Sequence, residues 1–187
     1  IGSEIVRQII NYYPKNVIIL DQAESPLHSL KLEISEYSNK INVFTIIADI
    51  KDYHVIERVF SQYKPDLVYH AAAYKHVPMM EDNPSQAVFT NVLGTKNLAD
   101  LSAKYMVERF VMVSTDKAVT PSNVMGASKR IAEKYVQSLN YSIQDSNKKI
   151  KTKFITTRFG NVLGSNGSIV PLFTKQIQEG GPLTISH

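Results

Sequence analysis

Short apolar runs rich in branched side chains alternate along this chain with longer segments whose apolar residues recur at helical spacing. Strands are predicted at Val17–Leu20, Val43–Ala48, Leu67–Tyr69, Arg109–Ser114 and Phe154–Thr157. Helices are predicted at Ser3–Tyr12, Pro26–Tyr37, Tyr53–Tyr63, Pro84–Tyr105, Asn123–Leu139 and Ile169–Glu179. Because parallel strands need crossover connections, and such crossovers are right-handed, this order predicts an α/β fold with a doubly wound parallel sheet.

The length of the chain favours a single domain. It has 187 residues, of which 43% are hydrophobic, enough for one sizeable core and too few for two domains of ordinary size. Ile1 begins directly inside a helical pattern, and His187 follows a strand-like segment, Leu183–Ser186, that nothing closes. We therefore expect one domain that is truncated at both ends and lacks the first strand of its sheet.

Charge and composition exclude several classes of function. The formal net charge is +4, but the Lys and Arg residues are spread along the chain, which favours an anionic ligand weakly and argues against nucleic-acid binding. The chain has no cysteine, which excludes disulfides, thiolate zinc clusters and thiol nucleophiles, and we predict no metal site. No apolar run approaches the roughly 18 residues that span a bilayer, so we expect no membrane contact by this segment.

Acidic residues follow the first two predicted strands, at the edge of a doubly wound sheet where ligands bind. Asp21 is placed to accept hydrogen bonds from the adenosine ribose of a dinucleotide, and its charge would repel a 2′-phosphate, which favours NAD over NADP. Asp49 occupies the same position after the next strand and could reach the adenine amino group. The alternative is that each carboxylate only caps a helix or opens a turn.

Small and polar residues surround the end of the third predicted strand. His70 is followed by Ala71, Ala72 and Ala73, which would let a pyrophosphate or nicotinamide ribose approach the backbone closely. A tight contact between helix and sheet explains the same residues equally well. Asn91 falls on the sheet-facing stripe of a predicted helix, where a buried amide needs partners. We expect it to brace the loops at the strand ends, either for a functional site or as a purely structural bond.

The fourth predicted strand ends in Ser114–Lys117, where Asp116 and Lys117 stand side by side. A carboxylate and an ammonium can donate and accept protons and can shift each other's pKa, although charged pairs are common in loops. Eight residues after Lys117 comes Met125-x-x-x-Lys129, and helical spacing places these two side chains on one face. Lys129 would then point into a cleft covered by the sheet, where ribose hydroxyls can pair with it, unless its ammonium snorkels out to solvent.

The last predicted strand is followed by Arg158–Ser165, with the sequence RFGNVLGS. An arginine, two glycines and an amide in a strand-end loop suit a diphosphate that approaches backbone N–H groups. A glycine-rich surface turn is the alternative, because each such loop alone is a weak signal.

Four segments, taken together, carry a close resemblance to a known family. They are DLVYHAAAYKHVPMM (Asp66–Met80), NVLG (Asn91–Gly94), VSTDKAVTPSNVMGASK (Val113–Lys129) and RFGNVLGS (Arg158–Ser165). They resemble the polysaccharide-biosynthesis UDP-N-acetylhexosamine 4,6-dehydratases, which are extended short-chain dehydrogenases/reductases. Such enzymes open with a strand and a glycine-rich TGxxGxIG loop, of which this chain has only Ile1–Gly2. The resemblance implies a Rossmann-like, NAD-binding domain over residues 1–187 that lacks the C-terminal substrate-binding part, with residues 160–187 beginning the substrate-binding region.

One departure from the wider group concerns Met125. Short-chain dehydrogenases generally use Tyr-x-x-x-Lys, in which the tyrosine is the base, and a thioether cannot accept that proton. The chain is similar in this respect to the long, membrane-associated branch of the dehydratases, which has the same methionine. The resemblance implies that the neighbouring Asp116 and Lys117 take over proton transfer.

The resemblance also implies a concealed redox cycle with bound NAD. Hydride leaves C4 of the sugar, the 4-keto group acidifies C5–H, water leaves across C5–C6, and the hydride returns to C6. Asp116 would handle the proton of the C4 or C6 hydroxyl, Lys117 would remove the C5 proton, and Thr115 would hydrogen-bond near C4. Met125 stands in the position of the missing tyrosine, and Lys129 would orient the nicotinamide ribose.

The remaining expectations concern binding residues, partners and location. The predicted cofactor-binding residues are Gly2, Asp21, Asp49, Ile50, His70, Ala71, Ala72, Ala73, Asn91 and Lys129. The predicted substrate-binding residues are Lys75, Arg158, Asn161, Val162 and Pro171. We expect UDP-GlcNAc as the substrate, a homo-oligomer, and a cytoplasmic location, either of a soluble protein or of the cytoplasmic domain of an inner-membrane protein. Two alternatives stay open: a UDP-sugar epimerase acting at C5 or C4, and an inactive NAD-binding or scaffold protein.

Overall fold

The chain folds around parallel strands, as its sequence pattern predicts. The structure is a computed structural model that describes residues 1–37, 40–145, 152–160, 162 and 169–183. Its strands are β1 (Asn16–Asp21), β2 (Asn42–Ile47), β3 (Leu67–His70), β4 (Arg109–Thr115) and β5 (Lys153–Phe159). Each predicted strand is present, and the pairings β1–β2, β3–β4 and β4–β5 are parallel, which confirms the α/β class.

Hydrogen bonds join the strands as two sheets instead of one. β1 pairs with β2, and the other sheet has the order β3-β4-β5. These two orders correspond to the two halves of a doubly wound sheet. In such a sheet the two halves lie on either side of a central strand, and the chain crosses from one half to the other. The register places Asp21 beside Ile47 and Thr115 beside Phe159, so neighbouring strands within each sheet end together.

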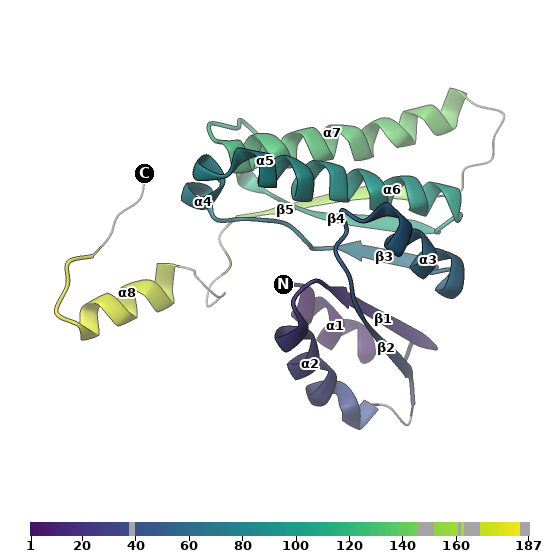
Figure 1. Ribbon diagram of the computed structural model, residues 1–187, viewed down its shortest axis with the longest axis horizontal. Helices are drawn as coiled ribbons and strands as arrows, with labels where there is room; N and C mark the ends of the chain where they lie inside the picture. The colour runs from purple at the N-terminus through teal and green to yellow at the C-terminus, as the bar shows by residue number, and fades with distance from the viewer. Residues whose placement is uncertain (38–39, 146–151, 161, 163–168, 184–187) are drawn as a thin grey trace.

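Helices connect the strands and cover the sheets (Figure 1). They include α1 (Gly2–Ile10), α2 (Glu24–Glu33) with the 3₁₀ turn η1 (Ile34–Tyr37), α3 (Tyr53–Tyr63), α6 (Thr95–Lys104), α7 (Val124–Asp145) and α8 (Ile169–Gln178). α6 and α7 lie along the β3-β4-β5 sheet, whereas α1 and α2 lie beside β1 and β2 (Figure 1). α8 stands apart from both sheets in the same view.

The segment before α6 differs from the prediction of one helix at Pro84–Tyr105. It is divided into α5 (Pro84–Ala87), a π-helical turn η2 (Val88–Gly94) and α6. A short helix, α4 (Val77–Asp82), precedes it and is not among the predicted helices. Six residues are too few to display a helical repeat, and a spacing of three and four cannot reveal a turn that is widened by one residue.

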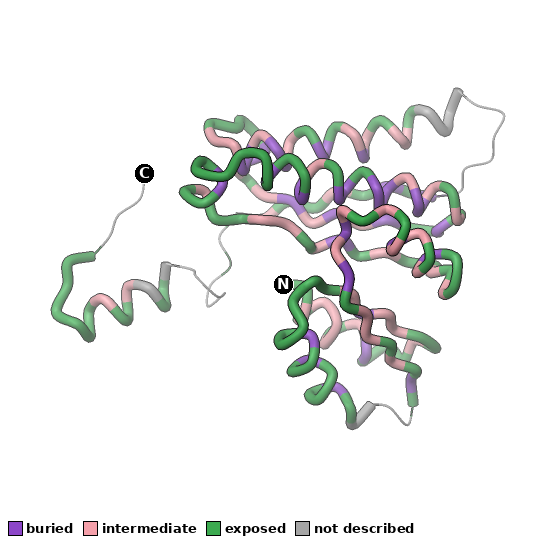
Figure 2. The backbone as a smooth tube through the Cα atoms, viewed as in Figure 1, coloured by how far each residue is buried: buried purple, intermediate pink, exposed green. Residues whose placement is uncertain are grey.

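Apolar clusters hold the elements together, and two of them pack helices against the sheets. The larger one joins α3, α6 and α7 to the β3-β4-β5 sheet and includes the fully buried Phe110, Met112 and Val136. The other packs α1 and α2 against β1 and β2 through residues such as Ile10 and Ile19. Figure 2 shows the buried positions of α6 and α7 on the sides that face the sheet. The carboxyl ends of the strands are left at the edge of this core, where the polar candidates lie.

Candidate active site

A small cavity opens where the ends of β1, β2 and β3 approach one another. It has a volume of about 200 Å³ and is lined by Leu20, Asp21, Gln22, Ala48, Asp49, Ile50, Ala71, Ala72, Ala73, Tyr74 and Thr90. Most of the predicted cofactor-binding residues therefore meet in one place. Gly2 lies near it, because a Cβ added there would be 3.8 Å from the Cβ of Ala71.

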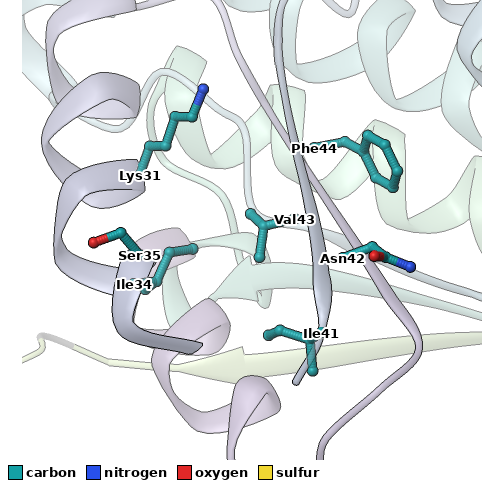
Figure 3. Close-up of a pocket in the computed structure, with 7 residues that line it drawn as sticks. All are labelled: Lys31, Ile34, Ser35, Ile41, Asn42, Val43 and Phe44. Carbon is teal, nitrogen blue, oxygen red and sulfur yellow. The ribbon is translucent and has the colours of Figure 1, made fainter. Parts of the chain in front are cut away.

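A larger hollow of about 320 Å³ lies elsewhere, between the end of α2, η1 and the start of β2 (Figure 3). Its lining includes Lys31, Ile34 and Val43. It adjoins the amino end of β2, whereas ligands of doubly wound folds bind at the carboxyl ends. We therefore assign the functional role to the smaller cavity.

Both acidic residues of the cavity also shape the turns in which they stand. Asp21 accepts a hydrogen bond from the backbone N–H of Ala23 at 2.9 Å. Asp49 accepts one from the backbone N–H of Lys51 at 2.9 Å and forms an ion pair with the Nζ of that lysine at 3.2 Å. Each carboxylate thus both forms its turn and lines the cavity.

His70, one of the predicted cofactor-binding residues, is buried and does not line the cavity. It is 2% exposed, and its Nε2 lies 2.8 Å from the Oγ1 of Thr95. That hydroxyl donates to the backbone carbonyl of Asn91, so Nε2 carries the proton that Thr95 accepts. Burial and the nearby charge of Lys129 lower the pKa of His70 to about 3. The imidazole is therefore neutral and serves the packing of β3 against α6.

Asn91 braces the segment after β3 through hydrogen bonds to its backbone, as the sequence predicts. Its Oδ1 accepts from the backbone N–H of Tyr74 at 2.9 Å, and its Nδ2 donates to the backbone carbonyl of Tyr74 at 3.0 Å. The same Nδ2 lies 3.0 Å from the Oγ of Ser128 on α7. This fully buried amide thus connects the segment after β3 to α7.

The paired charges at the end of β4 form a compact turn. Thr115 is the last residue of β4, and Asp116 opens the 3₁₀ turn η3 (Asp116–Ala118). The Oδ1 of Asp116 accepts from the Oγ1 of Thr115 at 2.9 Å, from the backbone N–H of Lys117 at 2.8 Å and from the Nζ of Lys117 at 3.3 Å. The Thr115 hydrogen bond, with those from Lys117 and its charge, lowers the pKa of Asp116. Asp116 is therefore an ionised, solvent-accessible carboxylate at neutral pH.

Two glycines of other elements lie close to this charged turn. A Cβ on Gly126, in the first turns of α7, would lie 2.5 Å from the carbonyl oxygen of Lys117, so any side chain there would force the backbone to shift. A Cβ on Gly160, just after β5, would lie 3.6 Å from the Oδ2 of Asp116. α7 and the end of β5 thus both adjoin the turn that carries Asp116 and Lys117.

Lys129 reaches the sheet from α7, one turn after Met125. Its Nζ donates to the backbone carbonyl of Val113 at 2.8 Å, and the residue is 5% exposed. Burial lowers the pKa of Lys129 to about 8, although the carboxylate of Glu133 opposes the shift. Met125 is buried in an apolar cluster with Met80 and Ala87. Met125, in the position where other short-chain dehydrogenases have their tyrosine, therefore packs against apolar side chains, and its place in the catalytic set stays a prediction.

A known protein family matches the chain over its whole length. Residues 1–187 match the protein family described as polysaccharide biosynthesis protein. The chain belongs to this family. Capsular polysaccharide biosynthesis protein CapD of Staphylococcus aureus is 51% identical over 188 residues, which cover 100% of this chain and 30% of CapD.

Relatives with two different activities match this member of the family at similar identity. UDP-N-acetylglucosamine 4,6-dehydratase (inverting) of Campylobacter jejuni is 36% identical over 91% of the chain and 48% of that protein. UDP-glucose 4-epimerase of Rickettsia canadensis is 36% identical over 100% of the chain and 50% of that protein. The X-ray structure of Pen from Bacillus thuringiensis is 34% identical, with a TM-score of 0.81, over 95% of the chain and 53% of that structure. The chain thus spans 30% to 53% of the length of these relatives.

The predicted substrate-binding residues that the structure describes lie on several elements. Lys75 is exposed just after the cavity-lining Tyr74, and Val162 is 40% exposed. Pro171 lies on α8, away from the sheets (Figure 1). Asn161 lies outside the described residues, as does most of the strand-like segment at 183–186. Arg158 forms an ion pair with Glu133 within the fold, and its contact with the nucleotide-sugar stays a prediction.

Sequence reasoning missed two residues that shape this site. Glu133 is fully buried on α7 and pairs with Arg158, and its signal was a charged residue on the same helical stripe as Lys129 and Val136. Gly126 is the close-approach point described above, and its signal was a glycine early in a predicted helix.

Two further findings limit the kinds of site in this family member. No helix in residues 1–37, 40–145, 152–160 and 169–183 combines the length and apolar character that crossing a bilayer requires. The same described residues include no group of three or more His, Asp or Glu side chains placed to hold a metal ion.

Proposed function

We propose that this chain forms the cofactor-binding and proton-transferring part of a nucleotide-sugar 4,6-dehydratase whose substrate is a UDP-N-acetylhexosamine, UDP-GlcNAc. The observation that carries the proposal is the Asp116 and Lys117 pair at the end of β4, at the edge where doubly wound folds bind their ligands. The identity with the C. jejuni dehydratase supports the same assignment.

The cavity at the ends of β1, β2 and β3 fits the adenosine half of NAD. Asp21 would accept hydrogen bonds from the ribose, Asp49 would face the adenine, and Ala71–Ala73 leave the backbone accessible. When bound, NAD supplies the oxidant for C4 of the sugar and the hydride that returns to C6. The carboxylate of Asp21 favours NAD because it would repel the 2′-phosphate of NADP.

The charged turn would perform the proton transfers. Asp116, ionised at neutral pH, accepts the proton of the C4 hydroxyl during oxidation and then delivers it to the C6 hydroxyl, which leaves as water. Lys117 takes the C5 proton that the 4-keto group acidifies, and it returns a proton to C5 when the hydride reaches C6. Thr115 hydrogen-bonds near C4, and Lys129 orients the nicotinamide ribose from its place beside Val113.

The decisive experiment uses the full-length protein with Asp116→Asn and Lys117→Ala. Each change should abolish formation of the 4-keto-6-deoxy product from UDP-GlcNAc, followed by NMR, while NAD remains bound. Lys134→Ala, which removes an exposed lysine of α7, is the matched control and should retain turnover. Full turnover by either variant of the charged pair refutes the assigned roles.

An epimerase is the second candidate, because a UDP-glucose 4-epimerase matches the chain at the same identity as the dehydratase. Both reactions pass through a 4-keto sugar, and return of a proton to the other face of C5, or of hydride to C4, gives an epimer. The same NMR experiment separates them, since loss of the C6 hydroxyl marks dehydration. An inactive NAD-binding protein would give neither product. Homo-oligomerisation stays a prediction, which light scattering of the full-length protein tests.

A further inference from the structure

Glu133 is a carboxylate enclosed completely by the fold. It lies on α7 next to Ala132, which is also fully buried, and its side chain has 0% exposure. A buried carboxylate is strongly unfavourable unless cations and hydrogen bonds compensate its charge. Its partners therefore show what α7 gains by placing it there.

The main partner of Glu133 comes from another element. Arg158, on β5, donates from Nε to Oε1 at 2.8 Å and from Nη2 to Oε2 at 2.5 Å, a two-pronged contact that matches the planar geometry of both groups. Arg130 adds a weaker contact at 3.3 Å from within α7 itself. Burial alone would raise the pKa of Glu133, but the hydrogen bonds and charge of Arg158 lower it.

The pair lies directly beneath the charged turn. Arg158 stands opposite Ser114 in the register, and Phe159 stands opposite Thr115. Gly160 follows and lies near Asp116, because a Cβ added to Gly160 would be 3.6 Å from the Oδ2 of Asp116. Gly160 is only two residues after Arg158, so a displacement of Arg158 would also displace the backbone beside Asp116.

A second link from the same face of α7 reaches the neighbouring strand. Lys129, one helical turn before Glu133, bonds to the carbonyl of Val113 on β4. α7 is thus fastened to β4 and β5 at adjacent points, just before the residues assigned to proton transfer. The charged and titratable groups facing Lys129 are His70 from β3 and Glu133 from α7.

We propose that Glu133 and Arg158 are a positioning pair, which fixes the end of β5 against α7 and so holds Gly160 and Asp116 in place for the reaction. The inference rests on the proposed function of Asp116. It assigns Arg158 to the support of the site and away from direct contact with the nucleotide-sugar diphosphate.

The kinetic test compares Glu133→Gln and Arg158→Lys in the full-length protein. Each should lower kcat roughly tenfold or more with KM for UDP-GlcNAc changed by less than about threefold, because small misplacements of catalytic groups are costly and lysine lacks the planar fork. Arg130→Gln is the matched control, since it also removes a contact to Glu133 but joins no second element. A raised KM with unchanged kcat in Arg158→Lys, together with a normal Glu133→Gln enzyme, would show that Arg158 binds substrate and overturn the proposal.

Two further measurements keep the test independent of folding failure and of the activity itself. The double variant Glu133→Met with Arg158→Met replaces the pair by apolar side chains, a change that buried ion pairs often tolerate in stability. It should fold and bind NAD but lose kcat as the single variants do, and wild-type kcat would overturn the proposal. If the wild type forms no 4-keto product, the proposed function fails independently of the Glu133–Arg158 pair. The position of Glu133 beside Lys129 is then still testable by NMR of ¹³C-labelled lysine. Glu133→Gln should move the titration of Lys129 to lower pH, and an unmoved titration counts against the pair.

Discussion

The neutral, buried His70 makes a quantitative prediction about stability and pH. Its pKa is about 3 in the fold, against about 6.5 in an unfolded chain. The unfolded chain therefore binds more protons than the folded one at acid pH, so the contribution of His70 to stability is present above about pH 6.5 and is lost as the pH falls toward 3.

The size of the effect follows from the linkage relation. Between pH 7 and pH 5, His70 should account for a loss of about 2 kcal/mol in the free energy of unfolding. This figure depends almost entirely on the unfolded value, because the folded pKa is already far below 5. His70→Gln keeps a side-chain N–H for Thr95 and removes the titrating group.

The assay is urea denaturation of wild type and variant at both pH values, with the cofactor concentration held constant. The difference in unfolding free energy between pH 7 and pH 5 should be smaller in His70→Gln by about 2 kcal/mol. The same substitution at the exposed His28 is the matched control and should leave the wild-type difference in place. Equal pH dependence in wild type and His70→Gln would mean that the imidazole is charged or solvated, and the reasoning about its burial would be wrong.

Three further substitutions test the geometry of the site. Gly126→Ala should lower turnover roughly tenfold or more in the dehydratase assay, because its Cβ would lie 2.5 Å from the carbonyl of Lys117; unchanged turnover would contradict the close approach. Gly94→Ala should destabilise the protein by about 1–3 kcal/mol in thermal unfolding, because its Cβ would lie 2.4 Å from the Cδ1 of Ile50, and adding Ile50→Val should recover part of the loss. Asp21→Asn should reduce the preference for NAD over NADP, measured as the ratio of the two Kd values, and an unchanged ratio would remove Asp21 from cofactor selection.

The strands and the carboxyl edge of the sheet were predictable, because short apolar runs separated by segments of helical spacing are typical of buried parallel strands. The positions of Asp21, Asp49 and Asp116 at strand ends follow from the same pattern, since parallel strands end on one side. The cavity gathers most of the residues that were predicted to bind the cofactor.

The partners of the charged side chains were not predictable from one sequence. Arg158 next to two glycines indicated a diphosphate site, yet the fold brings Glu133 to it from 25 residues away along the chain. His70 showed the same limit, because position after a strand does not tell whether a side chain faces the cavity or the core. Long-range pairing depends on how α7 lies across the sheet, which local spacing does not encode.

The widened turn at Val88–Gly94 determines which side chains of α6 face the sheet. An α-helix rotates by about 100° per residue, so removal of one residue from this turn would restore an ordinary helix at the expense of turning α6 by about that angle relative to α5. Leu98 and Leu101 would then leave the sheet, and their places would be taken by neighbours of different chemistry. Homologous chains with an insertion or deletion at this point should therefore carry a shifted apolar stripe in the downstream helix.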